Sequence, residues 1–171
     1  MREQFSNKIV FCIFAVASVA VIWSSWPVPE VSQPAAFPHA KHVGLRISCV
    51  SCHNGAFDEV RARIPSTRLC ALCHRAGLSF PPTPLQLAAF ITARREIPWE
   101  QAQRLPRHVY FSHRRHVGVA GIGCAKCHGD LGVKIEPVTR GFFKRGEAGM
   151  MQCVECHRRE KVTTDCLGCH H

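Results

Sequence analysis

Hydrophobic positions in this chain of 171 residues form one long stretch near the N-terminus and only short runs after it. The long stretch, IVFCIFAVASVAVIWSSW at residues 9–26, contains no charged side chain, and two basic residues precede it. Its 18 residues are near the lower limit for a membrane-spanning helix, and two tryptophans lie where an interfacial aromatic belt is expected. The pattern predicts a retained transmembrane anchor at 9–26 with residues 1–8 in the cytoplasm, whereas a signal peptide cleaved near Ala20 is the alternative.

From residue 27 onward the hydrophobic runs are short, and all 11 prolines and 12 glycines lie in this part. The pattern predicts short helices and irregular loops with little strand. One longer helix is expected in the segment 81–107, where LQLAAFITARREI would have Thr83 as N-cap and Pro84 as first residue and would end before Pro98. We interpret this helix as a packing element; a docking surface for a partner subunit is the alternative.

A C-x-x-C-H motif occurs five times and uses ten of the 11 cysteines, leaving only Cys12 inside the apolar stretch. This motif is the attachment signature of c-type haem, because its two thiols add to the haem vinyl groups and its histidine ligates the iron from the proximal side. The motifs are Cys49, Cys52 and His53; Cys70, Cys73 and His74; Cys124, Cys127 and His128; Cys153, Cys156 and His157; and Cys166, Cys169 and His170.

Structural zinc and disulfides are the alternatives, and neither explains a histidine directly behind every cysteine pair. We therefore predict five covalently attached haem c groups, around which the polypeptide wraps in place of an ordinary core. The net charge of +10 is matched by about ten haem propionates, which are ionised at neutral pH. The basic balance is thus weak evidence for an anionic partner, and no nucleic acid is expected.

Two segments of the chain repeat each other. FPHAKHVGLRISCVSCH at 37–53 and FSHRRHVGVAGIGCAKCH at 111–128 both read F-x-H-x-x-H-V-G followed by C-x-x-C-H, and the second is one residue longer. Each is followed by a further C-x-x-C-H motif. The chain therefore divides into a linker at 27–36, a dihaem unit at 37–80, the helical linker at 81–107, and a second dihaem unit with the fifth haem at 108–171.

The paired histidines of the repeat are candidates for the distal ligands. Histidines three residues apart on a helical turn project from the same side, so they can reach two neighbouring haems but not both faces of one. We predict that His39 and His113 each ligate one haem and that His42 and His116 each ligate another. The alternative is that one histidine of each pair hydrogen-bonds a propionate.

Four such histidines leave the fifth haem without a distal ligand. Met150 is the candidate chosen here, because the glycine-rich segment GEAGMMQC can loop back over a ring. His171 and His108 are the alternatives, with Met151 also available. Packing of the methionines on a porphyrin face is an equally good interpretation. A methionine ligand would raise the reduction potential relative to histidine.

The F-x-H-x-x-H segment before C-x-x-C-H resembles the cytochrome c7 and c3 group of multihaem proteins. REIPWEQAQRLPRHVYFSHRRHV at 95–117, with GIGCAKCHGD behind it, resembles the pentahaem subunit of alternative complex III. It is also similar to the multihaem subunit of a related periplasmic menaquinone reductase complex. The resemblance implies an N-terminal membrane helix, a haem domain on the periplasmic side of the cytoplasmic membrane, and iron–sulfur and polytopic membrane partners in a quinol-oxidising assembly.

Histidine on both sides of an iron leaves no position for a substrate and suits electron transfer. We therefore expect this chain to relay electrons to a periplasmic carrier and to have no catalytic residue of its own. A soluble periplasmic shuttle of the c7 or c3 type, released by signal cleavage, is the alternative.

Overall fold

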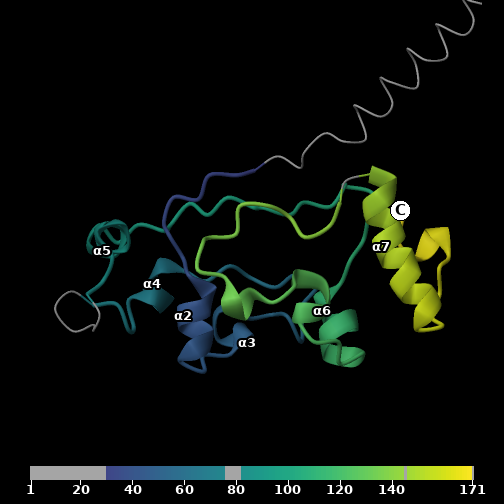
Figure 1. The fold of residues 1–171 in the computed structure, drawn as a ribbon, viewed down its shortest axis with the longest axis horizontal. Coiled ribbons are helices and arrows are strands. Elements are labelled where there is room, and N and C mark those ends of the chain that lie inside the picture. The colour runs from purple at the N-terminus through teal and green to yellow at the C-terminus, as the bar shows by residue number, and fades with distance from the viewer. Residues whose placement is uncertain (1–29, 76–81, 145, 171) are drawn as a thin grey trace, which may run out of the picture.

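The computed structural model describes residues 30–75, 82–144 and 146–170 (Figure 1). The predicted cytoplasmic segment 1–8, the predicted anchor 9–26 and His171 lie outside these ranges. Within the described ranges, every helix is too short or too polar to cross a bilayer.

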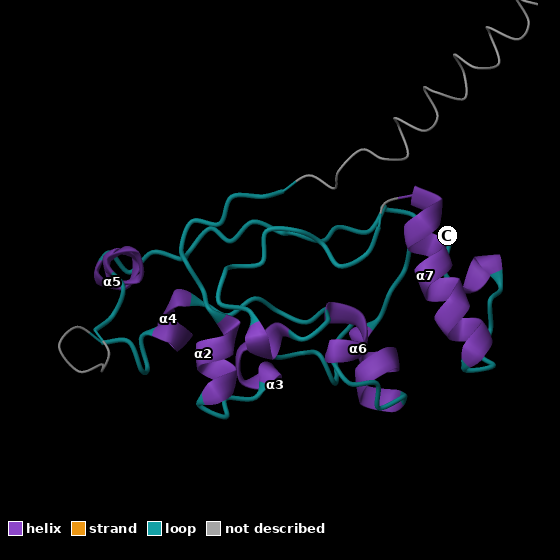
Figure 2. Cartoon of the chain, in the orientation of Figure 1, coloured by secondary structure: helices purple, strands orange, loops and turns teal. Residues whose placement is uncertain are grey.

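The described chain consists of short helices joined by loops (Figure 2). Among these residues the only β-type pairing is an isolated bridge between Val109 and His170. The predicted class of short helices and loops with little strand is thus confirmed. In chain order the elements are α2 (His39–Gly44), α3 (Cys49–Cys52), α4 (Thr67–Cys70), α5 (Leu85–Thr92), the π-helical turn η1 (Arg114–Val119), α6 (Ala125–His128), the 3-10 turn η2 (Leu131–Val133), α7 (Gly146–Arg159) and the 3-10 turn η3 (Cys166–Gly168).

Extended segments from three parts of the chain lie side by side and connect the two repeats. The Gln33 side chain donates to the carbonyl oxygens of Glu100 and Val138, at 2.8 and 2.9 Å. The Gln103 side chain accepts a hydrogen bond from the Phe143 backbone at 3.0 Å. In Figure 1 these segments run along one long edge of the molecule, and α2, α3 and α6 lie on the opposite side. The segments are 30–36, 97–107 and 134–143.

The helix predicted in the segment 81–107 is present but shorter than expected. Pro84, rather than Thr83, occupies the N-cap position of α5, and the Pro84 side chain makes no capping hydrogen bond. The helix ends at Thr92 instead of continuing to residue 97, because Arg94 adopts a left-handed conformation with φ of 51°. A non-glycine residue in this region interrupts an α-helix. The predicted boundaries were therefore wrong at both ends.

After α5 the chain is held against the second C-x-x-C-H motif. The backbone N–H of Thr67, in α4, donates to the Glu96 carboxylate at 2.8 Å. The backbone N–H of Ile97 donates to the Thr67 hydroxyl at 2.9 Å. Both Thr67 and Ile97 are buried, so the bond between them is shielded from water. The linker thus packs on α4.

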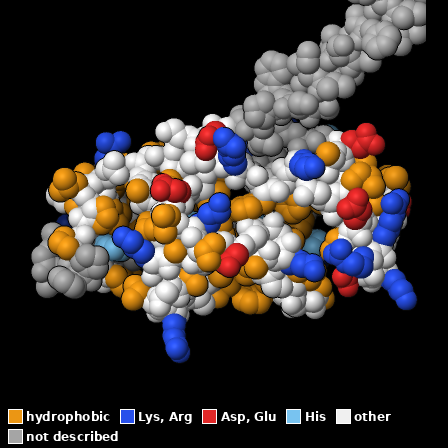
Figure 3. Space-filling view, in the orientation of Figure 1, with side chains coloured by type: hydrophobic (Ala, Val, Ile, Leu, Met, Phe, Trp, Pro, Cys, Tyr) orange, Lys and Arg blue, Asp and Glu red, His pale blue; other side chains and the backbone are white. Residues whose placement is uncertain are grey.

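Few described side chains are buried by protein alone. The buried hydrophobic residues are Ala35, Ala56 and Ile97, and no described side chain is fully enclosed. Hydrophobic side chains are instead spread over the surface (Figure 3). A polypeptide of this length ordinarily closes a hydrophobic core. The scarcity of buried side chains in the described ranges is what is expected of a chain that wraps around large apolar groups.

Candidate functional site

The C-x-x-C-H motifs share one local geometry. In four of them the backbone N–H of the histidine donates to the carbonyl oxygen of the first cysteine, and the fourth motif in the chain lies within α7. Residues at i, i+3 and i+4 of a helical turn lie on one face, so each motif presents two thiols and an imidazole together. The four bonds are His53 to Cys49 at 2.8 Å, His74 to Cys70 at 2.9 Å, His128 to Cys124 at 3.0 Å and His170 to Cys166 at 2.9 Å.

The cysteines of the described chain form no disulfide. Burial is the main cause that raises the pKa of several of these thiols. No group of three or more His, Cys, Asp or Glu side chains in the described ranges is arranged to hold a metal ion by itself. A thiol of a different motif contributes to the pKa rise in five cases: Cys73 for Cys52, Cys52 for Cys70, Cys49 for Cys124, Cys156 for Cys127, and both Cys127 and Cys169 for Cys153.

The phenylalanine of the F-x-H-x-x-H segment packs against both histidines that follow it. In the first copy the Phe37 ring stacks on His42, with ring centres 4.4 Å apart, and meets His39 edge-on at 4.7 Å. In the second copy Phe111 stacks on His116 at 4.4 Å and meets His113 edge-on at 4.9 Å. The two histidines of each pair are therefore held in different orientations by one aromatic ring.

The repeats differ in the helical turn that carries these histidines. The first copy forms the α-helix α2, whereas the second forms the π-helical turn η1. In η1 the Ala120 N–H bonds to the Arg115 carbonyl five residues back. A π-turn holds one more residue than an α-turn. The extra residue of the second copy lies between its histidines and its C-x-x-C-H motif, so the wider turn takes it up there: the Ile122 N–H bonds the His116 carbonyl six residues back, whereas the equivalent Ile47 N–H bonds the His42 carbonyl five residues back.

Each histidine of a repeat faces the histidine of a C-x-x-C-H motif. The ring centres of His113 and His128 are 6.3 Å apart, and those of His116 and His157 are 6.0 Å apart. With metal–imidazole bonds of about 2 Å and ring centres about 1 Å beyond each nitrogen, two imidazoles on opposite sides of one metal have centres about 6 Å apart. The observed spacing fits one iron between each pair.

The first repeat makes the same kind of pairs. The ring centres of His42 and His74 are 6.1 Å apart. Burial is the main cause that lowers the pKa of His39, and His53 lies near enough to His39 for its positive charge to lower that pKa further. The histidines of α2 therefore reach two different C-x-x-C-H motifs.

The fifth motif is paired with a histidine from outside the repeats. The His108 ring stacks on His170 with centres 5.4 Å apart and planes 21° from parallel. The Tyr110 N–H, which bonds the Cys169 carbonyl at 2.8 Å, fixes this approach. Met150 was expected to belong to a loop, but its segment forms part of α7 and its side chain is 45% exposed. The structure therefore brings His108, one of the sequence-based alternatives, to the fifth motif.

The described histidines fall into five pairs, which we number by their C-x-x-C-H motif along the chain. Site 1 contains His53 and His39, site 2 His74 and His42, site 3 His128 and His113, site 4 His157 and His116, and site 5 His170 and His108.

Backbone carbonyls orient several of these rings. His116 Nδ1 donates to the Ser112 carbonyl at 2.8 Å, and His157 Nδ1 donates to the Thr163 carbonyl at 2.7 Å. A carbonyl can only accept, so Nδ1 carries the proton and Nε2 keeps its lone pair for a metal. The same contact links His42 to Pro38 at 3.1 Å and His53 to Arg63 at 2.9 Å.

Three buried side-chain nitrogens of the described chain have no hydrogen-bond partner: His39 Nδ1, His74 Nδ1 and Trp99 Nε1. The Trp99 ring meets Phe37 edge-on at 6.3 Å and so lies beside the histidines of α2. Burial is also the main cause that lowers the pKa of His39, His74 and His128, which favours the neutral imidazole that binds metals. An indole N–H without a partner beside two sites fits a propionate acceptor.

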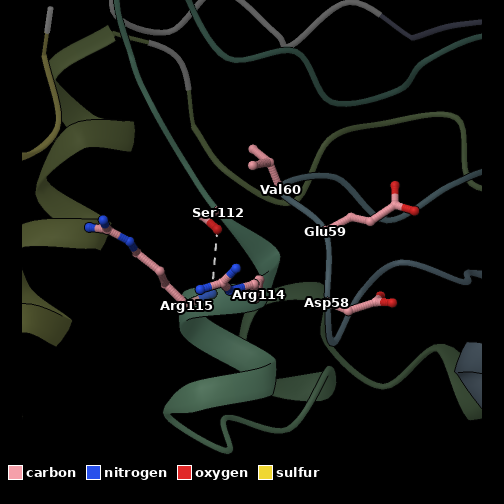
Figure 4. Close-up of a pocket in the computed structure, with 6 residues that line it drawn as sticks. All are labelled: Asp58, Glu59, Val60, Ser112, Arg114 and Arg115. Carbon is pink, nitrogen blue, oxygen red and sulfur yellow. Dashed lines mark hydrogen bonds between the residues drawn. The ribbon is translucent and has the colours of Figure 1, made fainter.

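A charged hollow lies where the two units meet (Figure 4). The backbone of Glu59 and Val60 accepts hydrogen bonds from Arg114 and His113, both at 2.9 Å. Asp58 and Glu59 lie on one wall, and Arg114 lies across from them. This contact places the first unit directly against the distal histidine of site 3.

The paired imidazoles, the clustered thiols and the scarcity of a protein core together fit bound haem. Sequence reasoning missed the packing role of Phe37 and Phe111, although both belong to the repeated motif. It also missed the backbone carbonyls that accept hydrogen bonds from the histidines, because no sequence signal marks them.

Residues 109–171 match the family described as cytochrome c7 and related cytochrome c. The chain is also 30% identical over 181 residues to the "Menaquinone reductase, multiheme cytochrome c subunit" of Nitratidesulfovibrio vulgaris (strain Hildenborough), with 89% of this chain and 85% of the relative covered.

The chain belongs to this family of multihaem c-type cytochromes. As a multihaem cytochrome c it binds haem c covalently and functions in electron transfer.

Proposed function

We propose that this multihaem cytochrome binds five haem c groups, each between two histidines, and relays electrons as a subunit of a membrane-bound quinone oxidoreductase. The observation that carries the proposal is the set of five histidine pairs, each containing one C-x-x-C-H histidine. Bound haem supplies one-electron redox chemistry at its iron. The protein supplies the two thiols, both axial imidazoles and the spacing between sites.

In this proposal the two cysteines of each C-x-x-C-H motif attach one haem; the first cysteines of the motifs are Cys49, Cys70, Cys124, Cys153 and Cys166. The fifth iron is ligated by His108 rather than by Met150. Two axial histidines fill both open positions of an iron, so the sites exchange electrons without binding substrate. The chain thereby has no catalytic site of its own.

The haem count is tested by intact-mass spectrometry of the protein matured in a host that attaches haem c. The proposal expects a mass equal to the polypeptide plus five haems. Replacing both cysteines of one motif by alanine should remove one haem and leave the others. A mass with fewer than five haems in the unaltered protein would overturn the count.

The proposal about partners starts from the relative, whose name describes it as a subunit of a menaquinone reductase. We propose that this chain works with iron–sulfur and polytopic membrane subunits, is anchored through residues 9–26, and places its haem domain on the periplasmic side. One end of the relay then serves a quinone-reactive partner and the other a periplasmic carrier. The apolar stretch and the likeness to the relative support this.

Native separation of detergent-solubilised membranes, stained for haem and analysed by mass spectrometry, tests the assembly. The proposal expects this chain in a large band that also contains iron–sulfur and polytopic subunits, with the peptide covering residues 9–26 retained. If the chain is found alone in the periplasmic fraction and lacks that peptide, it is a soluble shuttle. Adding menaquinol or menaquinone to the isolated band shows in which direction the haems are reduced or oxidised.

A further inference from the structure

The five sites do not follow one another in space as they do along the chain. Sites 1 and 2 are joined by α2, because His39 and His42 lie three residues apart in this one helix. Sites 3 and 4 are joined in the same way by His113 and His116 at η1. Two histidines three residues apart lie within one helical turn of each other. Each repeat therefore fixes two sites as direct neighbours.

The contact between the repeats joins site 1 to site 3. The Arg63 carbonyl accepts the hydrogen bond from His53 Nδ1 at 2.9 Å. The next residue toward the N-terminus, Ala62, places its backbone N–H 3.3 Å from His113 Nδ1. Two consecutive residues thus touch the proximal histidine of site 1 and the distal histidine of site 3. Site 2 has no part in this contact.

A close backbone approach holds the same junction. The backbone of Phe57, which follows site 1 in the chain, passes so near Gly118 that a side-chain carbon there would collide with the Phe57 carbonyl oxygen. The equivalent glycine of the first repeat, Gly44, has open space around it. Only the second repeat therefore needs the glycine for packing, and it needs it against the site 1 segment.

Site 4 leads to site 5 through a single residue. The Thr163 carbonyl accepts from His157 Nδ1 at 2.7 Å, and the Thr163 hydroxyl accepts from the Asp165 N–H at 3.2 Å. Asp165 in turn caps η3, which carries the fifth motif. Figure 1 shows the resulting arrangement along the long axis: α4 lies toward one end, then α2 and α3, then α6, then α7 with the C-terminal segment.

We propose that the five haem sites form one row in the order 2, 1, 3, 4, 5, with sites 2 and 5 at its ends. The thiol neighbours described above occur between the same adjacent pairs. A one-electron exchange between neighbours oxidises one iron, reduces the next and breaks no bond. The chain order would make sites 2 and 3 neighbours; the structure separates them and inserts site 1. This inference rests on the proposed function, because it needs an iron at each histidine pair.

The order is tested with two double variants that differ only in which histidine of α2 is removed. H39A/H113A opens the irons of sites 1 and 3, whereas H42A/H113A opens those of sites 2 and 3. Loss of one axial histidine converts a low-spin ferric iron to a high-spin one, which electron paramagnetic resonance detects separately. The full-length oxidised protein in detergent is used, and its absorbance per polypeptide checks that all haems remain.

The proposed row predicts strong magnetic coupling between the two high-spin irons in H39A/H113A, so its spectrum departs from the sum of the single variants. The H42A/H113A spectrum should equal the sum of its single variants, because dipolar coupling falls with the cube of distance. Equal coupling in both, or stronger coupling in H42A/H113A, would overturn the order. If the single variants show no high-spin iron at all, the ligand assignment itself fails, which is a different result.

Methionine variants keep the test open if an alanine variant does not mature. H39M/H113M and H42M/H113M raise the potentials of the same sites without opening them. Neighbouring irons influence each other electrostatically, so the row predicts a non-additive shift in H39M/H113M and additive shifts in H42M/H113M. Additive shifts in H39M/H113M would overturn the order.

Discussion

The imidazole rings of His108 and His170 lie stacked with their centres 5.4 Å apart, although His108 belongs to neither repeated motif. Under the proposed assignment, this pairing gives the fifth site the same two axial histidines as the other four. The same assignment requires no methionine ligand.

The fifth ligand is tested by comparing His108→Ala with Met150→Leu. His108→Ala should produce one high-spin ferric iron per chain, because an axial position opens. Met150→Leu should leave the ferric spectrum unchanged, since Met150 is 45% exposed on α7. Electron paramagnetic resonance of the two oxidised variants measures the amount of high-spin ferric iron in each. A high-spin signal in Met150→Leu, with none in His108→Ala, would restore the methionine.

The reduction potentials of the sites should differ according to the hydrogen bonds that their histidines make at Nδ1. At site 4 both rings donate to carbonyls, His116 to Ser112 at 2.8 Å and His157 to Thr163 at 2.7 Å. Such bonds make an imidazole a stronger donor, which stabilises the ferric state and lowers the potential. At site 2 the buried Nδ1 of His74 has no partner. Site 4 is therefore expected to have a lower potential than site 2, and the lowest of the five.

Potentiometric titration of two methionine variants locates that lowest component. His116→Met should remove it, because methionine in place of histidine raises the potential of site 4. His42→Met is the matched control, since it changes the equivalent histidine of the other repeat and should leave the lowest component in place. Survival of the lowest component in His116→Met would show that these hydrogen bonds do not set the order of potentials.

Gly118 and Gly44 occupy equivalent positions of the repeat but should respond differently to alanine. Gly118→Ala forces its new carbon into the Phe57 carbonyl and should cost about 1–3 kcal/mol of folding free energy. Gly44→Ala meets no atom within 4 Å and should be neutral or slightly stabilising, because alanine favours a helix. Thermal unfolding of the haem-loaded proteins compares the two. Equal melting temperatures would argue against the contact between the repeats.

Thr67 should anchor the linker to site 2 through its hydroxyl. Thr67→Val keeps the shape of the side chain but leaves the buried Ile97 N–H without its acceptor, which costs about 1–3 kcal/mol. Thr67→Ser retains the acceptor and should lose less. The difference in free energy of unfolding between the two variants isolates the hydroxyl. A valine variant as stable as the serine variant would mean that the bond contributes nothing.

Local chemistry was predictable from the sequence because each haem motif is complete within five consecutive residues. The repeat was predictable for the same reason, and so was a fold with little strand. The boundaries of α5 were not, because its end depends on Arg94 turning left-handed so that Ile97 can reach Thr67. That contact spans two distant segments and leaves no mark in the local pattern.

The pairing of histidines could be predicted only in part. Spacing predicted that His39 and His42 serve different haems, but it did not predict which C-x-x-C-H motif each histidine would face. His108 has no partner at helical spacing, and its approach to His170 depends on a backbone bond from Tyr110 to Cys169. The order of the sites depends on the contact between residues 57–63 and η1, which is likewise a tertiary feature.

The central claim is that one chain holds five irons, each between two histidines. Near-infrared magnetic circular dichroism of the oxidised, full-length protein, quantified per polypeptide, tests it most directly, because the energy of the charge-transfer band identifies the axial ligand pair. The account predicts bis-histidine bands with an intensity equivalent to five haems and no other low-spin or high-spin component. A histidine–methionine band, a high-spin band, or an intensity equivalent to fewer than five haems would contradict it.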